Sequence, residues 1–454
     1  MSPIDTLPDD VLLAIFDFSW DEDHVAKKQV EAWQLLVQVC RRWRSVVFES
    51  THRLNLRLVC TPGTPATDTL HIWPPLPLYI RCYGDYTTKG VDNIITVLGH
   101  SNRVRQIDLM YIPGSNLQKV SAAMQEPFPQ LTHLELSSSD EMVPVLPDLF
   151  LGGYAPSLKF LWLNRIPFPA LPKLLSSATH LVQLYLINIS HSGYVSPEHM
   201  LAALCTLTSL AALHLDFQSP LSRPDRASRR RPTPTRSVLP ALTNFLYKGV
   251  TEYLENVVSR IDAPKLKYLD VTFFNQILFD TPQFIRFISR TPTLTALEKA
   301  RVAFADGAAR INFSSQTLGF GELTVKIPCR ELDWQVSALE QICASCLPSL
   351  STLDLYIYMD KVGYWQDKVE NTLWMELLRP FAAVSNLYLS KQVTPRIMPA
   401  IQELVGDRTT EVLPALQNIF LEGLQSSGPV QEGIRQFVAT RQLTSHPIAV
   451  SAWR

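Results

Sequence analysis

The feature that most constrains the fold is a leucine pattern, L-x-x-L-x-L, that returns along the chain. Full copies begin at Leu131, Leu158, Leu181, Leu210 and Leu350, and looser copies begin at Val104, Leu242, Leu266, Val384 and Leu416. Starts at 104, 131, 158, 181 and 210 are separated by 27, 27, 23 and 29 residues. Alternating leucines indicate half-buried strands, and this period is typical of units that bury their apolar face only by stacking on neighbours.

Helical patterns lie between these strands. They cover Leu171 to Ala178, Pro197 to Leu207, Tyr253 to Arg260, Pro282 to Arg290, Val336 to Cys346, Leu373 to Ala383 and Pro395 to Val405. Strand, helix and strand at this period predict an α/β fold, a leucine-rich-repeat solenoid shaped as a horseshoe with a parallel β-sheet on its concave face. Residues 300–330 fit poorly, because Glu322 to Ile327 alternates strictly without a preceding L-x-x-L, and we expect a broken repeat there.

The N-terminal stretch predicts two amphipathic helices. Thr6, Pro8 and Asp9 form a helix-start signal, so the first helix should begin at Leu7 or Pro8. A second helix is expected from Trp33 to Val47, with apolar residues at steps of three and four. Such a hairpin is too small to bury both faces alone, so it needs a partner within the chain or outside it.

This N-terminal stretch resembles an F-box, the module that docks on the Skp adaptor of cullin-RING ubiquitin ligases. The resemblance implies that the adaptor contacts Leu7, Pro8, Val11, Leu12, Ile15, Phe16, Leu36, Val39, Cys40 and Trp43. The segment between the two halves, at residues 18–28, is longer and more acidic than in the family. The alternative is an amphipathic hairpin that only caps the following domain.

An F-box followed by leucine-rich repeats is the layout of many ligase substrate receptors, and the chain resembles F-box proteins of mushroom-forming fungi. The resemblance implies a non-catalytic subunit of an SCF-type ligase that holds an unknown protein substrate on its repeats, so that ubiquitin transfer occurs by proximity. A second class of function also fits the sequence, namely a repeat-based protein-binding scaffold whose N-terminal hairpin is purely structural.

The predicted organisation is an F-box at 1–52, a junction with short strands at 53–102, repeats at 103–427 and a C-terminal cap at 428–454. The chain has 454 residues, 46% of them hydrophobic, and a net charge of -1, which does not favour nucleic acid as the main partner. A signal peptide and long apolar runs are lacking, and the seven cysteines are scattered. These features predict an intracellular protein, cytoplasmic or nuclear, without a membrane partner.

The sequence predicts no catalytic residue, cofactor or metal site. Cys343 and Cys346 form a C-x-x-C, but they share a helical stripe with Leu339 and Ile342, which is the spacing of core residues. The histidines form no H-x-x-x-H pair, and neither a G-x-S-x-G nor a phosphate-binding loop is present.

A basic segment at 219–237 interrupts the repeats with arginines and prolines. It could be a nuclear-import signal, a phosphate-binding patch or a phosphoregulated loop, but the interpretation we favour is a disordered, charged insertion.

Side chains at alternate strand positions should point to the concave face and contact the protein substrate. The candidates for this contact are Trp162, Tyr185, His214, Tyr268, Asp270, Asp354, Tyr356 and Tyr388, with Glu135, Asn164, Asp216 and Phe420 at equivalent positions. The alternative is that these side chains are hidden by packing against one another.

Overall fold

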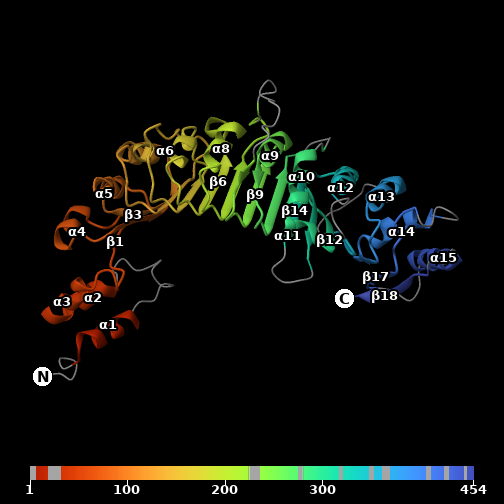
Figure 1. Cartoon of the computed structure of the whole chain (residues 1–454), viewed down its shortest axis with the longest axis horizontal. Helices are drawn as coiled ribbons and strands as arrows, with labels where there is room; N and C mark the ends of the chain where they lie inside the picture. The colour runs from red at the N-terminus through yellow and green to blue at the C-terminus, as the bar shows by residue number, and fades with distance from the viewer. Residues whose placement is uncertain are drawn as a thin grey trace. The chain divides into compact units, whose positions relative to one another are not determined.

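The computed structural model describes most of the chain. The described residues are 7–18, 32–222, 224, 236–274, 279, 281–315, 321–346, 352–359, 369–404, 411–423, 429–443 and 447–453. The chain divides into two compact units, Met1–Tyr185 with Ser192–Tyr194, and Leu186–His191 with Val195–Arg454. In each unit the helices that connect the strands lie along one face of a sheet (Figure 1).

The sheet of the first unit is parallel throughout. Its strands, in spatial order, are β1 (Leu58–Cys60), β2 (Leu78–Tyr83), β3 (Val104–Ile112), β4 (His133–Ser138) and β5 (Phe160–Asn164). The residues at 53–102 thus add two strands to the sheet that the repeats build. The helices between the strands are α4 (Ala66–Ile72), α5 (Thr88–Leu98), α6 (Gly114–Ala123), η3 (Phe150–Gly153) and α7 (Leu171–Leu175). Strand β6 (Gln183–Ile189) contains the division between the units.

The second unit has a longer sheet. Its strands, in spatial order, are β7 (Ala212–Phe217), β9 (Asn244–Gly249), β11 (Tyr268–Phe273), β14 (Glu322–Pro328), β13 (Ala308–Ser314), β12 (Lys299–Ala305), β15 (Asp354–Met359), β16 (Asn386–Leu389), β17 (Asn418–Glu422) and β18 (Ala449–Trp453). Its helices are α8 (Pro197–Leu204), α9 (Thr251–Val258), α10 (Pro282–Arg290), α11 (Pro292–Thr295), α12 (Leu332–Cys346), α13 (Asn371–Leu378), α14 (Thr394–Gln402) and α15 (Pro429–Leu443). A separate small sheet pairs β8 (Ser237–Val238) with β10 (Ile261–Asp262).

A tight turn explains why proline often precedes the first leucine of a repeat. The amide of Leu131 donates to the carbonyl of Phe128 at 3.1 Å, with Pro129 at the second position of the turn. Leu158 closes the same turn onto Ala155 across Pro156. Proline favours that position because its ring fixes the φ angle that the turn requires. The turn places the leucine in the core immediately before each strand.

The repeat breaks at residues 299–328, as the sequence predicted. Strand β13 is antiparallel to both of its neighbours, β12 and β14, while β14 pairs in parallel with β11 and β12 pairs in parallel with β15. The chain reverses between β12 and β13 at Gly307, whose φ of 83° suits a residue without a side chain. The strict alternation of Glu322 to Ile327 therefore marks a strand of an antiparallel meander.

The N-terminal region contains three described helices, α1 (Asp9–Phe18), α2 (Ala32–Val39) and α3 (Arg41–Glu49). The prediction of one helix from Trp33 to Val47 was wrong. The chain leaves helical geometry at Cys40 (φ -157°, ψ 170°), whose Sγ accepts a hydrogen bond from the amide of Trp43 at 3.4 Å. A three- and four-residue apolar period cannot reveal this break, because the period continues from one helix into the next.

Contacts between the three helices fix their arrangement. The Nη2 atom of Arg42 lies 2.6 Å from Oδ1 of Asp9, and the rings of Phe16 and Trp43 are 4.9 Å apart. Trp33 is fully buried, and its indole Nε1 donates to the carbonyl of Arg57 at 3.1 Å. Trp33 therefore joins the helices to the residues just before β1. Thr6, which belongs to the predicted helix-start signal, and the segment at 19–31 lie outside the described residues.

The two cysteines of the C-x-x-C are buried in α12. Burial raises the pKa of Cys346 to about 12 and that of Cys343 well above its ordinary value. Both thiols therefore stay protonated and unreactive at neutral pH. Most of the basic segment, residues 223 and 225–235, lies outside the described residues.

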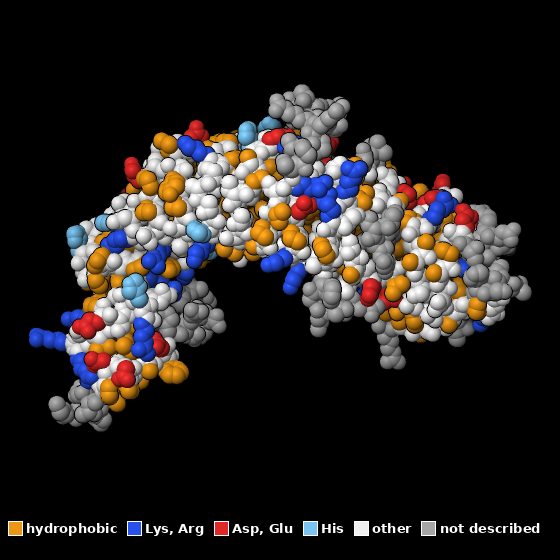
Figure 2. Space-filling view, viewed as in Figure 1, with side chains coloured by type: hydrophobic (Ala, Val, Ile, Leu, Met, Phe, Trp, Pro, Cys, Tyr) orange, Lys and Arg blue, Asp and Glu red, His pale blue; other side chains and the backbone are white. Residues whose placement is uncertain are grey.

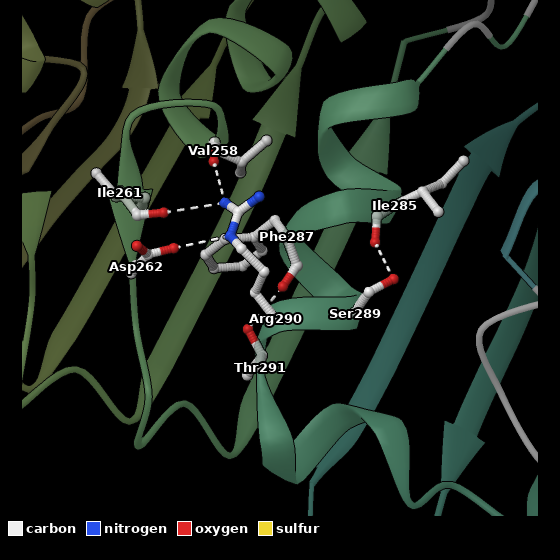
Figure 3. A network of polar contacts seen from close by, with 8 residues as sticks. All are labelled: Val258, Ile261, Asp262, Ile285, Phe287, Ser289, Arg290 and Thr291. Atoms are coloured by element: carbon white, nitrogen blue, oxygen red, sulfur yellow. Dashed lines mark hydrogen bonds and ion pairs between the residues drawn. The ribbon is translucent and has the colours of Figure 1, made fainter. Parts of the chain in front are cut away.

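An arginine at the end of α10 ties neighbouring repeats together (Figure 3). The Nε atom of Arg290 donates to Oδ1 of Asp262 at 2.8 Å. Its Nη2 atom donates to the carbonyl of Val258, the last residue of α9, at 3.2 Å and to the carbonyl of Ile261 in β10 at 3.4 Å. One guanidinium thus supplies a donor to a carbonyl at the end of α9, which has no helical partner, and to two acceptors of β10.

Replacing Arg290 with alanine should destabilise the second unit by about 1 to 3 kcal/mol, because the carbonyls and the Asp262 carboxylate lose their donor. Urea unfolding followed by circular dichroism measures this loss. The control is Arg286→Ala, an exposed arginine on the same helix, for which we expect a change within about 0.5 kcal/mol. Equal effects of the two substitutions would contradict the role assigned to Arg290.

Candidate binding surface

Side chains along each repeat strand alternate between core and surface. In β5, Leu161 and Leu163 are at most 3% exposed, whereas Trp162 between them is half-buried. The helices cover one face of the sheet (Figure 1). Because side chains alternate along a strand, the buried leucines point to that face and the intervening residues lie on the opposite side. We call the side opposite the helices the open face of each unit.

Aromatic rings gather on the open face of the second unit. The rings of Tyr356 and Tyr388 stack 4.1 Å apart at 8°, and those of Tyr388 and Phe420 stack 4.4 Å apart at 9°. Trp453 lies 5.7 Å from Tyr388 at 79°, so its ring meets the stack edge-on. Tyr358 stacks beside Tyr356 at 6.3 Å. These five residues are called the aromatic cluster.

The aromatic cluster exists because its strands pair in one register. Tyr356 of β15 is opposite Tyr388 of β16, which is opposite Phe420 of β17. Rings at opposite positions of parallel strands lie close enough to stack, and each stacked pair adds about 0.5 to 1.5 kcal/mol beyond the area it buries. The guanidinium of Arg301 lies over the ring of Tyr356, 5.7 Å from its centre. The stacked tyrosines are therefore held in place by neighbouring side chains.

Asp354, a predicted contact residue, belongs to a polar ladder beside the aromatic cluster. Its Oδ1 accepts from Nδ2 of Asn386 at 2.7 Å, and Oδ1 of Asn386 accepts from Nδ2 of Asn418 at 2.8 Å. Asp354 is only 6% exposed. This placement indicates that Asp354 mainly supports the strands rather than reaching a partner.

A charged region occupies the open face near β9, β11 and β14. Lys326 lies 2.8 Å from Oδ2 of Asp270, and the hydroxyl of Tyr268 donates to the same carboxylate oxygen at 3.2 Å. Burial, with the adjacent Asp270 charge, raises the pKa of Tyr268 to about 12. Burial also lowers the pKa of His214, which keeps its imidazole neutral at pH 7.

The open face of the first unit carries a second polar group of residues. Arg81 lies 3.2 Å from Oδ2 of Asp108, and Nε2 of His133 lies 3.4 Å from Oδ1 of the same carboxylate and 3.8 Å from Oε2 of Glu135. Burial raises the pKa of Asp108. Sequence reasoning named Glu135 but missed the other three, because they are neighbours only after β2, β3 and β4 pair.

The predicted contact residues thus separate into groups. Tyr356 and Tyr388 come together in the aromatic cluster, and Tyr268 and Asp270 come together in the charged region. Trp162 and Tyr185 lie on the open-face side of β5 and β6, where the ring of Tyr185 is 5.7 Å from that of Phe160. Trp453 was missed because the C-terminal residues were assigned to a cap, whereas Ala449–Trp453 forms strand β18, which pairs with β17.

The predicted adaptor-binding residues divide between the interior and the surface of the N-terminal helices. Leu12 and Phe16 are buried, whereas Val11, Ile15 and Val39 are exposed. The remaining predicted residues are at least partly exposed, namely Leu7, Pro8, Leu36, Cys40 and Trp43. Two exposed apolar side chains, Phe18 at 92% and Leu35 at 60%, were not predicted. Figure 2 shows hydrophobic and charged side chains interspersed on these helices.

Comparison with known proteins gives structural likeness without a match in sequence. No family model matches the chain, and no curated protein matches it. A crystal structure of an internalin from Listeria monocytogenes is similar to it with a TM-score of 0.29 and 10% identity, over 80% of this chain and 83% of that one. Among the described helices, none is long and apolar enough to span a membrane.

Proposed function

We propose that the chain is a non-catalytic protein-binding scaffold that uses the open face of its repeat sheet. The observation that carries this proposal is the aromatic cluster, in which half-buried rings cover neighbouring strands opposite the helices. Tyrosine and tryptophan are enriched at the centres of protein interfaces, where they supply large contact areas.

The geometry of the cluster favours binding for an entropic reason. A partner that docks on flexible side chains must order them, which costs about 0.5 to 1.5 kcal/mol for each side chain. Tyr356 and Tyr388 are already ordered by stacking on each other, and the indole Nε1 of Trp453 donates to the carbonyl of Leu389 at 3.2 Å. These rings lose little further freedom when a partner covers them.

Replacing Trp453 with alanine should therefore weaken partner binding by about 2 kcal/mol or more, as expected for an interface tryptophan. The measurement is quantitative co-purification of proteins with the full chain from its native cells. The matched control is Trp334→Ala, because Trp334 is a 49% exposed tryptophan on helix α12. Its loss should leave the set of co-purified proteins unchanged.

Two results would contradict the scaffold proposal. One is a partner that is lost with Trp334→Ala but kept with Trp453→Ala. The other is the absence of any partner whose recovery depends on an open-face residue. Circular dichroism of both variants shows whether the fold is retained, so that a folding defect is not mistaken for lost binding.

A second candidate function is that of a substrate receptor of a Skp-cullin-F-box ubiquitin ligase. It is favoured by the resemblance of the N-terminal residues to an F-box and by the exposed apolar side chains on α1 and α2. Ile15 is 47% exposed, and Leu35 and Val39 are 60% and 59% exposed. Apolar side chains exposed on helices this short suit a surface that a helical adaptor covers.

For this candidate, we expect Ile15→Asp to abolish binding to a fungal Skp adaptor, because the interface would have to bury an unpaired carboxylate. Co-expression followed by size-exclusion chromatography measures complex formation. The matched control is Ile72→Asp, since Ile72 is 69% exposed and belongs to helix α4 rather than to α1, α2 or α3.

Co-elution of the adaptor with the wild type and with Ile72→Asp, but not with Ile15→Asp, would support the receptor function. If the folded wild-type chain elutes alone, the N-terminal helices do not bind this adaptor and the scaffold proposal stands without a ligase role.

A further inference from the structure

We propose that Asp108, His133 and Glu135 form a binding site for a divalent transition-metal ion such as Zn²⁺. The three residues lie on the open face of the first unit, on neighbouring strands. The site supplies one imidazole nitrogen and two carboxylate oxygens, a donor set that zinc accepts.

Strand pairing brings the three ligands together. Asp108 of β3 is directly opposite Glu135 of β4, and His133 is two residues before Glu135, so all three side chains emerge on the same side of the sheet. The possible ligand atoms lie within 4.8 Å of one another. The register of β3 and β4 therefore places three donors around one point.

The spacing of the donors is close to that of a metal site. Two ligands of a tetrahedral zinc ion, each bonded at about 2.0 to 2.1 Å, are about 3.3 to 3.4 Å apart. The distance from Nε2 of His133 is 3.4 Å to Oδ1 of Asp108 and 3.8 Å to Oε2 of Glu135. The third pair, between the Asp108 and Glu135 oxygens, lies within 4.8 Å, so the partly exposed Glu135 side chain has to move closer to complete the geometry.

Asp108 provides an independent indication that a cation belongs here. Its side chain is only 4% exposed, and its two oxygens have different surroundings. Oδ2 accepts from Nε2 of Gln106 at 2.7 Å and lies near Arg81. Oδ1 is buried and accepts no hydrogen bond, although it faces His133. A buried carboxylate oxygen without a partner costs free energy, and a bound cation would remove that cost.

The imidazole is already oriented for this role. The ring of His133 stacks on that of Phe160 at 4.1 Å and 2°, which holds Nε2 toward the two carboxylates. The hydrogen bond from Gln106 fixes the orientation of the Asp108 carboxylate. Three protein ligands leave at least one coordination position for water or for a group of a bound partner, as in catalytic zinc sites.

Arg81 distinguishes a metal site from a plain ion-pair ladder. If the cluster is only a ladder, Asp108 simply pairs with Arg81 and His133, and neither residue should affect metal binding. If it is a metal site, the positive charge of Arg81 opposes the cation and weakens its binding. Arg81→Gln should then increase the metal affinity.

The experiment is isothermal titration of ZnCl₂ into the full chain, purified without a histidine tag and stripped of metal by a chelator. We expect one Zn²⁺ per chain, with the affinity reduced by roughly tenfold or more in His133→Phe and in Glu135→Gln. His133→Phe retains an aromatic ring to stack on Phe160. Titration with Co²⁺ gives a visible absorption band that reports the coordination geometry directly.

The controls are His180→Gln and Glu141→Gln, which alter an exposed histidine and an exposed glutamate outside the site and should leave binding unchanged. The proposal is overturned if the folded wild type does not bind Zn²⁺, or if His133→Phe and Glu135→Gln bind it like the wild type. The titration needs no protein partner, so its outcome is independent of the scaffold proposal.

Discussion

Hydrogen bonds between successive turns set the register on which the rest of the structure depends. The amide of Thr132 donates to the carbonyl of Arg105 at 2.9 Å, and the amide of Lys159 donates to the carbonyl of Thr132 at 2.9 Å. The same pattern recurs in the second unit, where Gln417 donates to Ser385 at 2.8 Å. Because side chains alternate along a strand, a slip of one residue would exchange core and open face.

Given this register, each candidate surface contains a row of residues that lie opposite one another on neighbouring strands. The stacked rings of Tyr356, Tyr388 and Phe420 form one row in the second unit. Asp108 and Glu135 form another in the first unit. Neither row is continuous in sequence, and each is assembled only when parallel strands align. A repeat fold can therefore change its binding chemistry by exchanging surface residues while the leucine core stays the same.

The sequence predicted the repeated strands and most later helices because their apolar periods are regular, and α10 matched from Pro282 to Arg290. It missed α4, α5 and α6, whose apolar residues are mixed with glycine, threonine and serine. It also missed the break at Cys40, since a cap formed by a thiol leaves the helical period intact. The site formed by Asp108, His133 and Glu135 could not be predicted from the sequence. Asp108 is distant from the other two in the chain, and a histidine two residues before an acid on one strand is a weak signal.

The binding role of the open face is the central claim, and site-specific photo-crosslinking tests it most directly. A photoreactive phenylalanine analogue is placed at position 420 on β17 or, as a control, at position 334 on helix α12. Irradiation in the native cells should link a specific partner protein to position 420 and not to position 334. Crosslinks from position 334 alone would show that partners bind the helical side, and would contradict the role assigned to the open face.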